Sequence, residues 1–223
     1  VRPITTKEGT IAASLSIAVD HVLRSPDNKL SLGCLTAYSA LHNTIIGLEL
    51  KEQMKELGIV PDAVIGVVGG GSSFSGLVFP LLEEYRDKTR FIAIESASVP
   101  SFSKGEYRYE NPDLIGLMPR AKMYTLGNDF VPKNLVASGL NYHGKNQLLS
   151  LLVHEGYIGA RAYAHDEVDP VQDLFEQAEG IKAAAESCFE IKGAIEEAKA
   201  LSRNGEGTVV FSLTGNANSL EHI

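Results

Sequence analysis

The chain has 223 residues, of which 44% are hydrophobic and 22% charged, and a formal net charge of −8 at pH 7. This size suits one globular unit with a sizeable core, and the acidic balance disfavours a nucleic-acid surface. No apolar run approaches the roughly 18 residues of a membrane span, so we expect a cytoplasmic protein. The two cysteines, Cys34 and Cys188, have no zinc-binding spacing and are expected to be reduced structural thiols.

The first half of the chain predicts two helices followed by a strand–helix–strand unit. Apolar residues at helical spacing predict helices over residues 8–24 and 42–58, the second closed by a C-terminal glycine. Residues 63–68 form an unbroken apolar run typical of a buried strand, and residues 75–85 form the next helix. A second buried strand over residues 90–95 completes a βαβ unit, so the two strands are expected to be parallel.

The second half begins with residues 96–142, which are rich in Gly, Pro, Ser, Tyr and Asn. We expect a long irregular loop there that carries function. Three helices and a strand should follow, over residues 147–155, 169–178, 187–202 and 208–213. Pro170 would occupy the first turn of the middle helix. The alternation of strands and helices indicates one α/β domain over residues 1–223, with three α/β/α layers and a mostly parallel sheet.

A glycine run, Gly69-Gly70-Gly71-Ser72-Ser73, lies between the first predicted strand and its helix. Free backbone N–H groups at such a turn attract an anion, most often a phosphate. Ligands of open α/β sheets bind beyond the carboxyl ends of the strands, where Glu95 and Thr214-Gly215 also fall. The alternative interpretation of the glycine run is a tight connection that binds nothing.

Six motifs in chain order resemble the tryptophan synthase beta family, a fold-type II group of pyridoxal-phosphate enzymes, and in particular its subgroup of longer beta-like chains. They are GGGSSFSG (69–76), KGEYRY (104–109), KMYTLGNDFVP (122–132), SGLNYHG (138–144), EGI with a following ES (179–187) and TG (214–215). The resemblance implies the large cofactor domain of an enzyme that dehydrates L-serine to an aminoacrylate and adds indole to give L-tryptophan.

The resemblance also implies which residues hold the cofactor. Those assigned to pyridoxal 5′-phosphate are Gly69, Gly70, Gly71, Ser72, Ser73, Glu186, Thr214 and Gly215. The glycine loop would bind the phosphate, and Glu186 would lie near the ring. Thr214 would face the pyridine nitrogen and leave it unprotonated, which favours β-elimination and replacement chemistry. Glu95 would play a supporting role.

Two further assignments follow from the same motifs. Asn141 corresponds to a residue that closes the site on the substrate. Backbone carbonyls near Gly69, Tyr142 and Gly144 correspond to a monovalent-cation site, and no other metal is expected.

The family's Schiff-base lysine belongs to an N-terminal segment, and no lysine here has a matching context. Lys133 and Lys145 are each followed by Asn but lie in or just after the long loop. We therefore expect the C-terminal part of a longer enzyme, inactive alone, that depends on the missing segment or a complementing chain. Exposed apolar surface would make it a homo-oligomer.

Several residues around the implied ring site depart from the family pattern, among them Ser73, Asn141 and Asn216. Two other hypotheses therefore stay open. One keeps the cofactor but has threonine-synthase-like or serine/threonine-deaminase-like chemistry. The other is a non-catalytic binding or assembly domain.

Some polar residues also have plainer interpretations. Glu179 and Glu186 are seven apart and would share one face of a single helix as solvated carboxylates. His143 and His154 are expected to be polar surface residues. Lys104, Arg108 and Lys122 are expected to form surface salt bridges.

Overall fold

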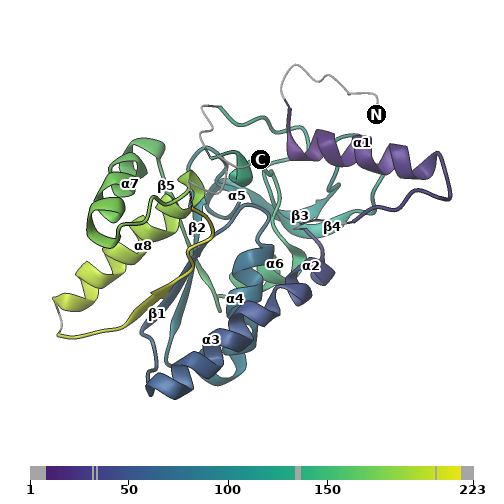
Figure 1. Ribbon diagram of the computed structural model, residues 1–223. Helices are drawn as coiled ribbons and strands as arrows, with labels where there is room; N and C mark the ends of the chain where they lie inside the picture. Colours follow the sequence, from purple (N-terminus) through teal and green to yellow (C-terminus); the bar gives the residue numbers. More distant parts are fainter. Residues whose placement is uncertain (1–8, 32, 34, 134–136, 204, 217–223) are drawn as a thin grey trace.

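The computed structural model describes residues 9–31, 33, 35–133, 137–203 and 205–216. A four-stranded sheet with the order β5-β2-β1-β6 is its middle layer, and every strand pairing in that sheet is parallel (Figure 1). The strands are β1 (Ala63–Val67), β2 (Arg90–Ser96), β5 (Gly159–Tyr163) and β6 (Val209–Phe211). The three-layer α/β architecture and the parallel pairing of β1 with β2 confirm the prediction from the sequence.

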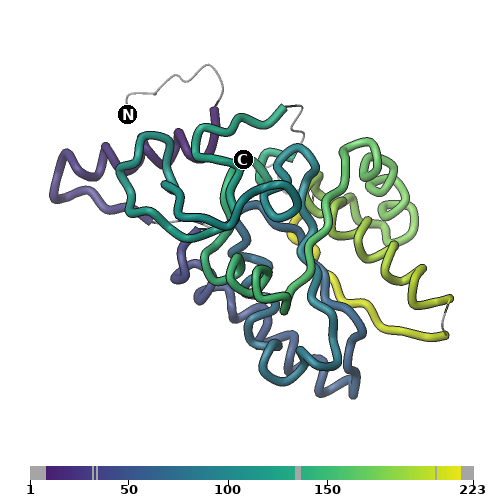
Figure 2. The backbone as a smooth tube through the Cα atoms, turned by 180° about the vertical axis from the view of Figure 1, so that it is seen from behind, coloured from purple at the N-terminus to yellow at the C-terminus, as the bar shows by residue number. Residues whose placement is uncertain are grey.

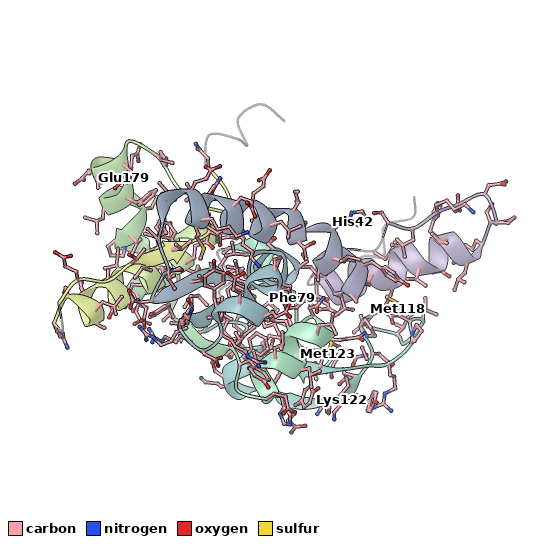
Figure 3. The ribbon with its side chains drawn as sticks, turned by 90° about the horizontal axis from the view of Figure 1, so that it is seen from below. His42, Phe79, Met118, Lys122, Met123 and Glu179 are labelled. Atoms are coloured by element: carbon pink, nitrogen blue, oxygen red, sulfur yellow. The ribbon has the colours of Figure 1, made fainter. Side chains whose placement is uncertain are left out.

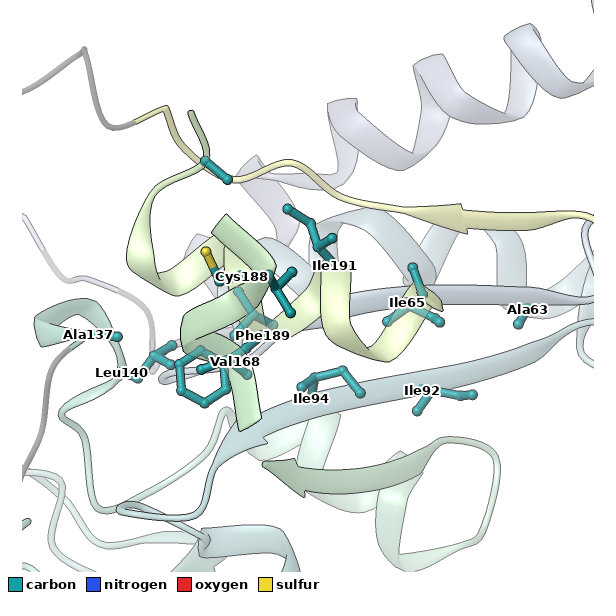
Figure 4. Close-up of a cluster of buried hydrophobic side chains, with 14 residues drawn as sticks. Ala63, Ile65, Ile92, Ile94, Ala137, Leu140, Val168, Cys188, Phe189 and Ile191 are labelled. Carbon is teal, nitrogen blue, oxygen red and sulfur yellow. The ribbon is translucent and has the colours of Figure 1, made fainter. Parts of the chain in front are cut away.

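The two central strands are apolar on both faces because helices cover both sides of the sheet. On one side lie α7 (His165–Glu179) and α8 (Ala185–Ser202). Figure 4 shows Ile65 and Ile94 of the sheet facing Phe189 and Ile191 of α8 across a buried apolar cluster. Val168 of α7 closes the same cluster.

The opposite face is covered by α3 (Thr44–Leu57), α4 (Ser72–Tyr85) and α6 (Gln147–His154). A second apolar cluster, which includes Val64, Leu77 and Leu149, fills this side. The α3–α4 crossing is very close, since a Cβ at Gly76 would lie 2.3 Å from the Asn43 carbonyl oxygen. As expected, α3 ends at a left-handed glycine, Gly58, with φ of 65°.

The predicted loop over residues 96–142 is wrong, because this stretch holds regular structure. It contains α5 (Ser101–Lys104), an antiparallel pair of strands, and the short 3₁₀ helix η1 (Ser138–Leu140). The strands β3 (Glu106–Glu110) and β4 (Ala121–Thr125) are short, and β3 has no fully buried residue, so the sequence signal for this pair is weak. The pair is stabilised by side-chain contacts such as the stacking of Tyr107 on Tyr124, with ring centroids 5.2 Å apart.

Two N-terminal helices complete the described structure, α1 (Ile11–Leu23) and α2 (Ala37–His42). Seen from behind, α1 lies beside the β3–β4 pair and away from α8 (Figure 2). Its Ser16 hydroxyl donates to the buried Asp113 carboxylate at 2.9 Å. Among the described helices, none has the length and apolar character to cross a lipid bilayer.

Two other expectations need correction. The helix predicted from residue 169 begins at His165, one turn earlier, so Pro170 lies inside α7. The Glu167 carboxylate accepts a hydrogen bond from the Ala164 N–H at 2.7 Å and stabilises that earlier start. The edge strand β5 was not predicted, because its sequence Gly-Ala-Arg-Ala-Tyr has neither an apolar run nor a clear alternation.

Of the two cysteines predicted to be structural thiols, the structure describes one. Cys188 lies on α8 as a free, buried thiol, as expected. Cys34 lies outside the described residues, so the prediction for it stays a prediction.

Candidate functional site

A cavity of about 530 Å³ lies beyond the carboxyl ends of β1 and β6. It therefore occupies the place where open α/β sheets bind their ligands. Its lining residues are Val67, Gly69, Ser73, Ser138, Gly139, Leu140, Ala184, Glu186, Thr214, Gly215 and Asn216. The sequence-predicted residues Gly69, Ser73, Glu186, Thr214 and Gly215 are among them, although they come from three separate stretches of the chain.

The carbonyl groups of Gly69 and Gly70 in the glycine loop are held by Lys145 and Asn146. The Gly69 carbonyl accepts a hydrogen bond from Lys145 Nζ at 2.9 Å, and the Gly70 carbonyl accepts one from the Asn146 N–H at 2.7 Å. Gly71 is the N-cap of α4 with φ of 100°, a conformation that favours glycine. Among the described residues no side chain caps this helix start, which leaves its first N–H groups available as donors. Ser73 of the same turn lines the cavity.

The predicted helix boundary is also corrected here. α4 begins at Ser72 rather than at residue 75, so Ser72 and Ser73 occupy its first turn. Gly69 has little space, since a Cβ there would lie 2.5 Å from the Gly139 carbonyl oxygen. The crowding at Gly69 therefore comes from η1, which packs against the glycine loop.

Glu186 lies in the first turn of α8 and connects that helix to η1. Its Oε1 accepts a hydrogen bond from the Gly139 N–H at 2.8 Å. The expected pairing of Glu186 with Glu179 on one helix face is wrong, because Glu179 ends α7 and Glu186 begins α8. Figure 3 shows Glu179 at the outer end of α7, far from the labelled residues of β4.

Thr214 is held by a buried network that the sequence did not predict. Its hydroxyl donates to Glu190 Oε1 at 2.9 Å, and its N–H donates to the same oxygen at 3.0 Å. Ser187 Oγ lies 2.9 Å from the Thr214 hydroxyl and accepts from the Gly215 N–H at 3.0 Å. The other Glu190 oxygen accepts from the Val67 N–H and the Ser212 hydroxyl.

Glu190 is fully buried among the apolar residues of α8 and the sheet. Burial raises the pKa of its carboxyl group, and the hydrogen bonds from Ser212, Val67 and Thr214 only partly oppose that rise. The signal for this residue was its spacing. Glu190 is four residues after Glu186, which places both carboxylates on the same face of α8.

A second buried group lies beneath the glycine loop. Glu95 is fully buried and accepts hydrogen bonds from the N–H groups of Phe102 at 3.0 Å and Ser103 at 2.8 Å. The Lys145 ammonium, also fully buried, lies 3.5 Å from the Glu95 carboxylate. Glu95 thus supports the site from beneath, and Lys145 is a second residue that sequence reasoning missed.

Three residues of the SGLNYHG motif, Asn141, Tyr142 and Gly144, have different surroundings in the structure. Asn141 does not line the cavity, and its amide donates to the Gly9 carbonyl at 3.3 Å. Tyr142 is buried and its hydroxyl donates to Pro112 O at 2.9 Å. Gly144 pairs with Thr125 in an isolated β-bridge.

The two histidines also differ from each other. His143 is buried, in contrast to the expected surface position, and its ring contacts the Thr125 hydroxyl at 2.8 Å. Burial lowers the pKa of its imidazole. His154 is exposed and lies against the Tyr107 ring. The expectation for Arg108 is confirmed, because it forms surface ion pairs with Glu106 and Glu110.

Comparison with known proteins identifies the family. The model of a family described as "Pyridoxal-phosphate dependent enzyme" matches residues 35–215. The chain belongs to this family of pyridoxal-phosphate-dependent enzymes.

Within the family, the chain is similar to proteins named tryptophan synthase beta chain. It is 43% identical to tryptophan synthase beta chain 2 of Aquifex aeolicus over 93% of this chain and 49% of the relative. It is 43% identical to the Thermosipho africanus tryptophan synthase beta chain, over 93% and 50%. The chain thus spans about half the length of the curated relatives it matches.

Two solved structures share the fold at low sequence identity. A threonine deaminase from T.th. matches with a TM-score of 0.56 and 17% identity, over 78% of this chain and 57% of that chain. The L-serine ammonia-lyase of Rhizomucor miehei matches with a TM-score of 0.59 and 17% identity, over 78% and 51%. These likenesses confirm the fold-type II α/β architecture.

The residues that line the cavity fit the family's cofactor in their donors and acceptors. It provides a helix start without a side-chain cap at one end, next to Gly69 and Ser73. It provides a hydroxyl and a carboxylate, from Thr214 and Glu186, along the rest of its lining. In the part of the chain that the structure describes, no lysine lines this cavity.

Proposed function

We propose that this chain is the cofactor-holding part of an enzyme that joins L-serine and indole into L-tryptophan. The carrying observation is the convergence of the glycine loop, Glu186 and Thr214 on one cavity. The 41–43% identity to tryptophan synthase beta chains supports the choice of reaction. Pyridoxal phosphate, when bound, withdraws electrons from the amino-acid substrate.

The phosphate is held by the loop from Gly69 to Ser73. A dianionic group gains most from donors that are already oriented, and the N–H groups at the start of α4 are fixed by the Gly71 turn. The Ser73 hydroxyl adds a donor that lines the cavity. The Lys145 ammonium and the Asn146 backbone N–H, which hold the loop carbonyls, keep these N–H groups in place.

The ring is positioned by the opposite wall of the cavity. Glu186 and the backbone of η1 form one rigid side, because the carboxylate accepts the Gly139 N–H. Thr214 and Gly215 form the other, anchored through Ser187. Asn141 directly follows η1, and we assign substrate closure to it.

The binding proposal is tested by titrating the purified chain with pyridoxal 5′-phosphate and following absorbance and heat. We expect saturable binding that inorganic phosphate competes with and that dialysis reverses. Ser73→Ala and Thr214→Val should each weaken binding about tenfold, since each removes one hydrogen bond to a charged or buried partner. Ser202→Ala, an exposed hydroxyl at the end of α8, is the matched control.

A lack of saturable binding, or equal weakening by the Ser202 control, would contradict the assigned site. Borohydride reduction followed by peptide mapping then tests the expectation that this chain holds no Schiff-base lysine. A cofactor-modified lysine peptide would overturn that expectation.

The reaction itself is tested on the complete protein with L-serine and indole. Tryptophan is the expected product. Ammonia and a keto acid without tryptophan would favour the deaminase-like alternative, for which Asn141 and Asn216 are the motivating residues. Failure to bind the cofactor at all would favour an assembly domain.

We also propose a cytoplasmic protein that associates with itself or with a complementing segment. The supporting observation is a row of exposed apolar side chains on α2 and α3. Its members are Tyr38, Leu41, Ile45 and Leu48, which are 77%, 67%, 57% and 51% exposed. A monodisperse monomer in light scattering at high concentration would contradict self-association.

A further inference from the structure

A buried ammonium group lies beneath the glycine loop, in surroundings that suit a small cation. The Lys145 side chain is fully buried. Its Nζ donates hydrogen bonds to the Val68 carbonyl at 3.3 Å and to the Gly69 carbonyl at 2.9 Å. The Glu95 carboxylate lies 3.5 Å from the same nitrogen, and the centroid of the Phe102 ring lies 5.6 Å from it. Carbonyl oxygens, a carboxylate and an aromatic ring face are groups that attract a monovalent cation.

The monovalent-cation site that the family resemblance implies, at the carbonyls near Gly69, Tyr142 and Gly144, overlaps with these surroundings. The Gly69 carbonyl already accepts a hydrogen bond from Lys145 Nζ. Lys145 directly follows Gly144 in the chain, so its side chain starts from the segment that would supply the other carbonyls. A metal ion bound to the Gly69 carbonyl would lie beside a buried positive charge, and like charges repel strongly where water is excluded. The residues present therefore do not fit a metal ion together with Lys145.

An ammonium group can take the place of such an ion. It has the same single charge, is close in size to a potassium ion, and has three N–H donors that can point at oxygen atoms. Here it balances the buried Glu95 carboxylate and holds the Gly69 carbonyl. A free ion must be captured from solution, whereas a lysine is attached to the chain and is present in any salt.

We propose that Lys145 is a built-in monovalent cation, which replaces a metal ion beneath the glycine loop so that the chain binds no alkali cation there. Its role is to hold the Gly69 end of the loop, whatever anion the loop then binds. The inference rests on Lys145 and its partners, and it stands whether or not pyridoxal phosphate binds. It follows that removing the side chain opens a site for a potassium or caesium ion among the Val68 and Gly69 carbonyls and the Glu95 carboxylate.

The test compares the unchanged chain with Lys145→Ala in potassium, caesium and tetramethylammonium chloride at equal ionic strength, with no cofactor or phosphate added. Denaturant unfolding followed by circular dichroism gives the midpoint in each salt. The midpoint of the unchanged chain should show no saturable dependence on which cation is present, since screening depends on ionic strength.

Lys145→Ala should respond to the cation. Its midpoint should be lower in tetramethylammonium chloride, because that ion is too large to enter and Glu95 stays unpaired. It should recover saturably in potassium or caesium chloride, because an ion that binds the folded chain stabilises it. A saturable rise in the unchanged chain, or a folded Lys145→Ala without any cation response, would overturn the proposal.

Lys145→Met is the matched control, since it removes the charge but keeps a side chain of similar length in the same space. It should be destabilised in all three salts without recovery. Recovery equal to that of Lys145→Ala would show a general salt effect and would count against a specific site. Lys55→Ala, at an exposed lysine, should behave as the unchanged chain does.

A measurement on the unchanged chain covers the case in which Lys145→Ala does not fold. Crystals soaked in caesium chloride should give no anomalous diffraction peak at the Gly69 carbonyl. A peak there refutes the proposal, whatever the variants show. Because no step of these experiments uses pyridoxal phosphate, a failure of the proposed function leaves their outcome unchanged.

Discussion

Two buried carboxylates lie beneath the same cavity, and different partners stabilise them. Glu95 lies under the glycine loop and has the Lys145 ammonium 3.5 Å away. Glu190 lies under Thr214 and, within the described residues, is surrounded by four uncharged donors with no ion pair.

The two carboxylates lie near opposite ends of the proposed cofactor. Glu95 lies at the phosphate end, and Glu190 lies at the ring end. An unpaired carboxylate beneath the loop would repel a phosphate, because charges interact strongly where water is excluded. Lys145 removes that repulsion. At the other end, Glu190 holds Thr214 through hydrogen bonds and not through an ion pair. The comparison therefore predicts that each carboxylate responds differently to mutation and to pH.

The largest expected effect is the loss of the Lys145 ammonium. Lys145→Met leaves Glu95 buried and unpaired, and we expect the free energy of unfolding to fall by about 3–5 kcal/mol. Denaturant unfolding followed by circular dichroism measures this change. The double variant with Glu95→Gln should recover most of the loss, since it removes the uncompensated charge.

The control for that prediction is an exposed ion pair. Lys55 pairs with Glu52 at 2.8 Å, with both side chains more than half exposed. Water screens such a pair, so Lys55→Met should leave the free energy of unfolding unchanged within measurement error. If Lys145→Met lowered the free energy of unfolding as little as Lys55→Met, the buried Lys145–Glu95 pair would not stabilise the fold. The comparison of the two carboxylates would then fail.

A smaller effect is expected from the titration of Glu190. Because burial raises the pKa of this carboxyl in the folded chain, its stabilising contribution is complete below the ordinary value of 4.5. Stability is then lost as pH rises from there through the folded pKa, at no more than about 1.4 kcal/mol per pH unit. Glu190→Gln removes this slope.

The measurement is the difference in unfolding free energy between the unchanged chain and Glu190→Gln, taken across pH 4 to 8. Taking the difference cancels the titration of the other groups. A difference that does not vary with pH would mean that Glu190 has the same pKa in the folded and unfolded chain.

Most of the sheet could be predicted from the sequence because burial on both faces leaves an unbroken apolar run. That is true of β1 and β2. It fails for β5, an edge strand that contains Arg161, whose charge is paired with the buried Glu197 of α8. Long-range pairing of that kind leaves no local signal.

The candidate site also contains residues that a local pattern predicts and residues that depend on distant partners. The glycine loop is a local pattern, and Glu186 and Thr214 were assigned through motifs. Glu190 and Lys145 were missed because the burial of a charge depends on its partners. The spacing of Glu190 from Glu186 indicates a shared helix face but not burial. The partners lie more than twenty residues away in the chain, as Thr214 does from Glu190 and Glu95 from Lys145.

The smallest expected effect concerns Cys188, which lies on α8 beside Ser187. Its thiol is buried and its pKa is raised to about 11 by burial. Only the thiolate reacts with disulfide reagents, so in a Cys34→Ser background at pH 8 we expect labelling roughly a hundredfold slower than in denaturant. Glu190→Gln should raise the native rate a few-fold by loosening this turn of α8, whereas Lys55→Met should not. Cys188 lines a small cavity between α8 and α7, so unequal rates in these two variants would show that Glu190 restrains this turn of α8. Equal rates would mean that α8 is held by its apolar contacts alone, and that Glu190 orients Thr214 without stabilising the helix that carries it.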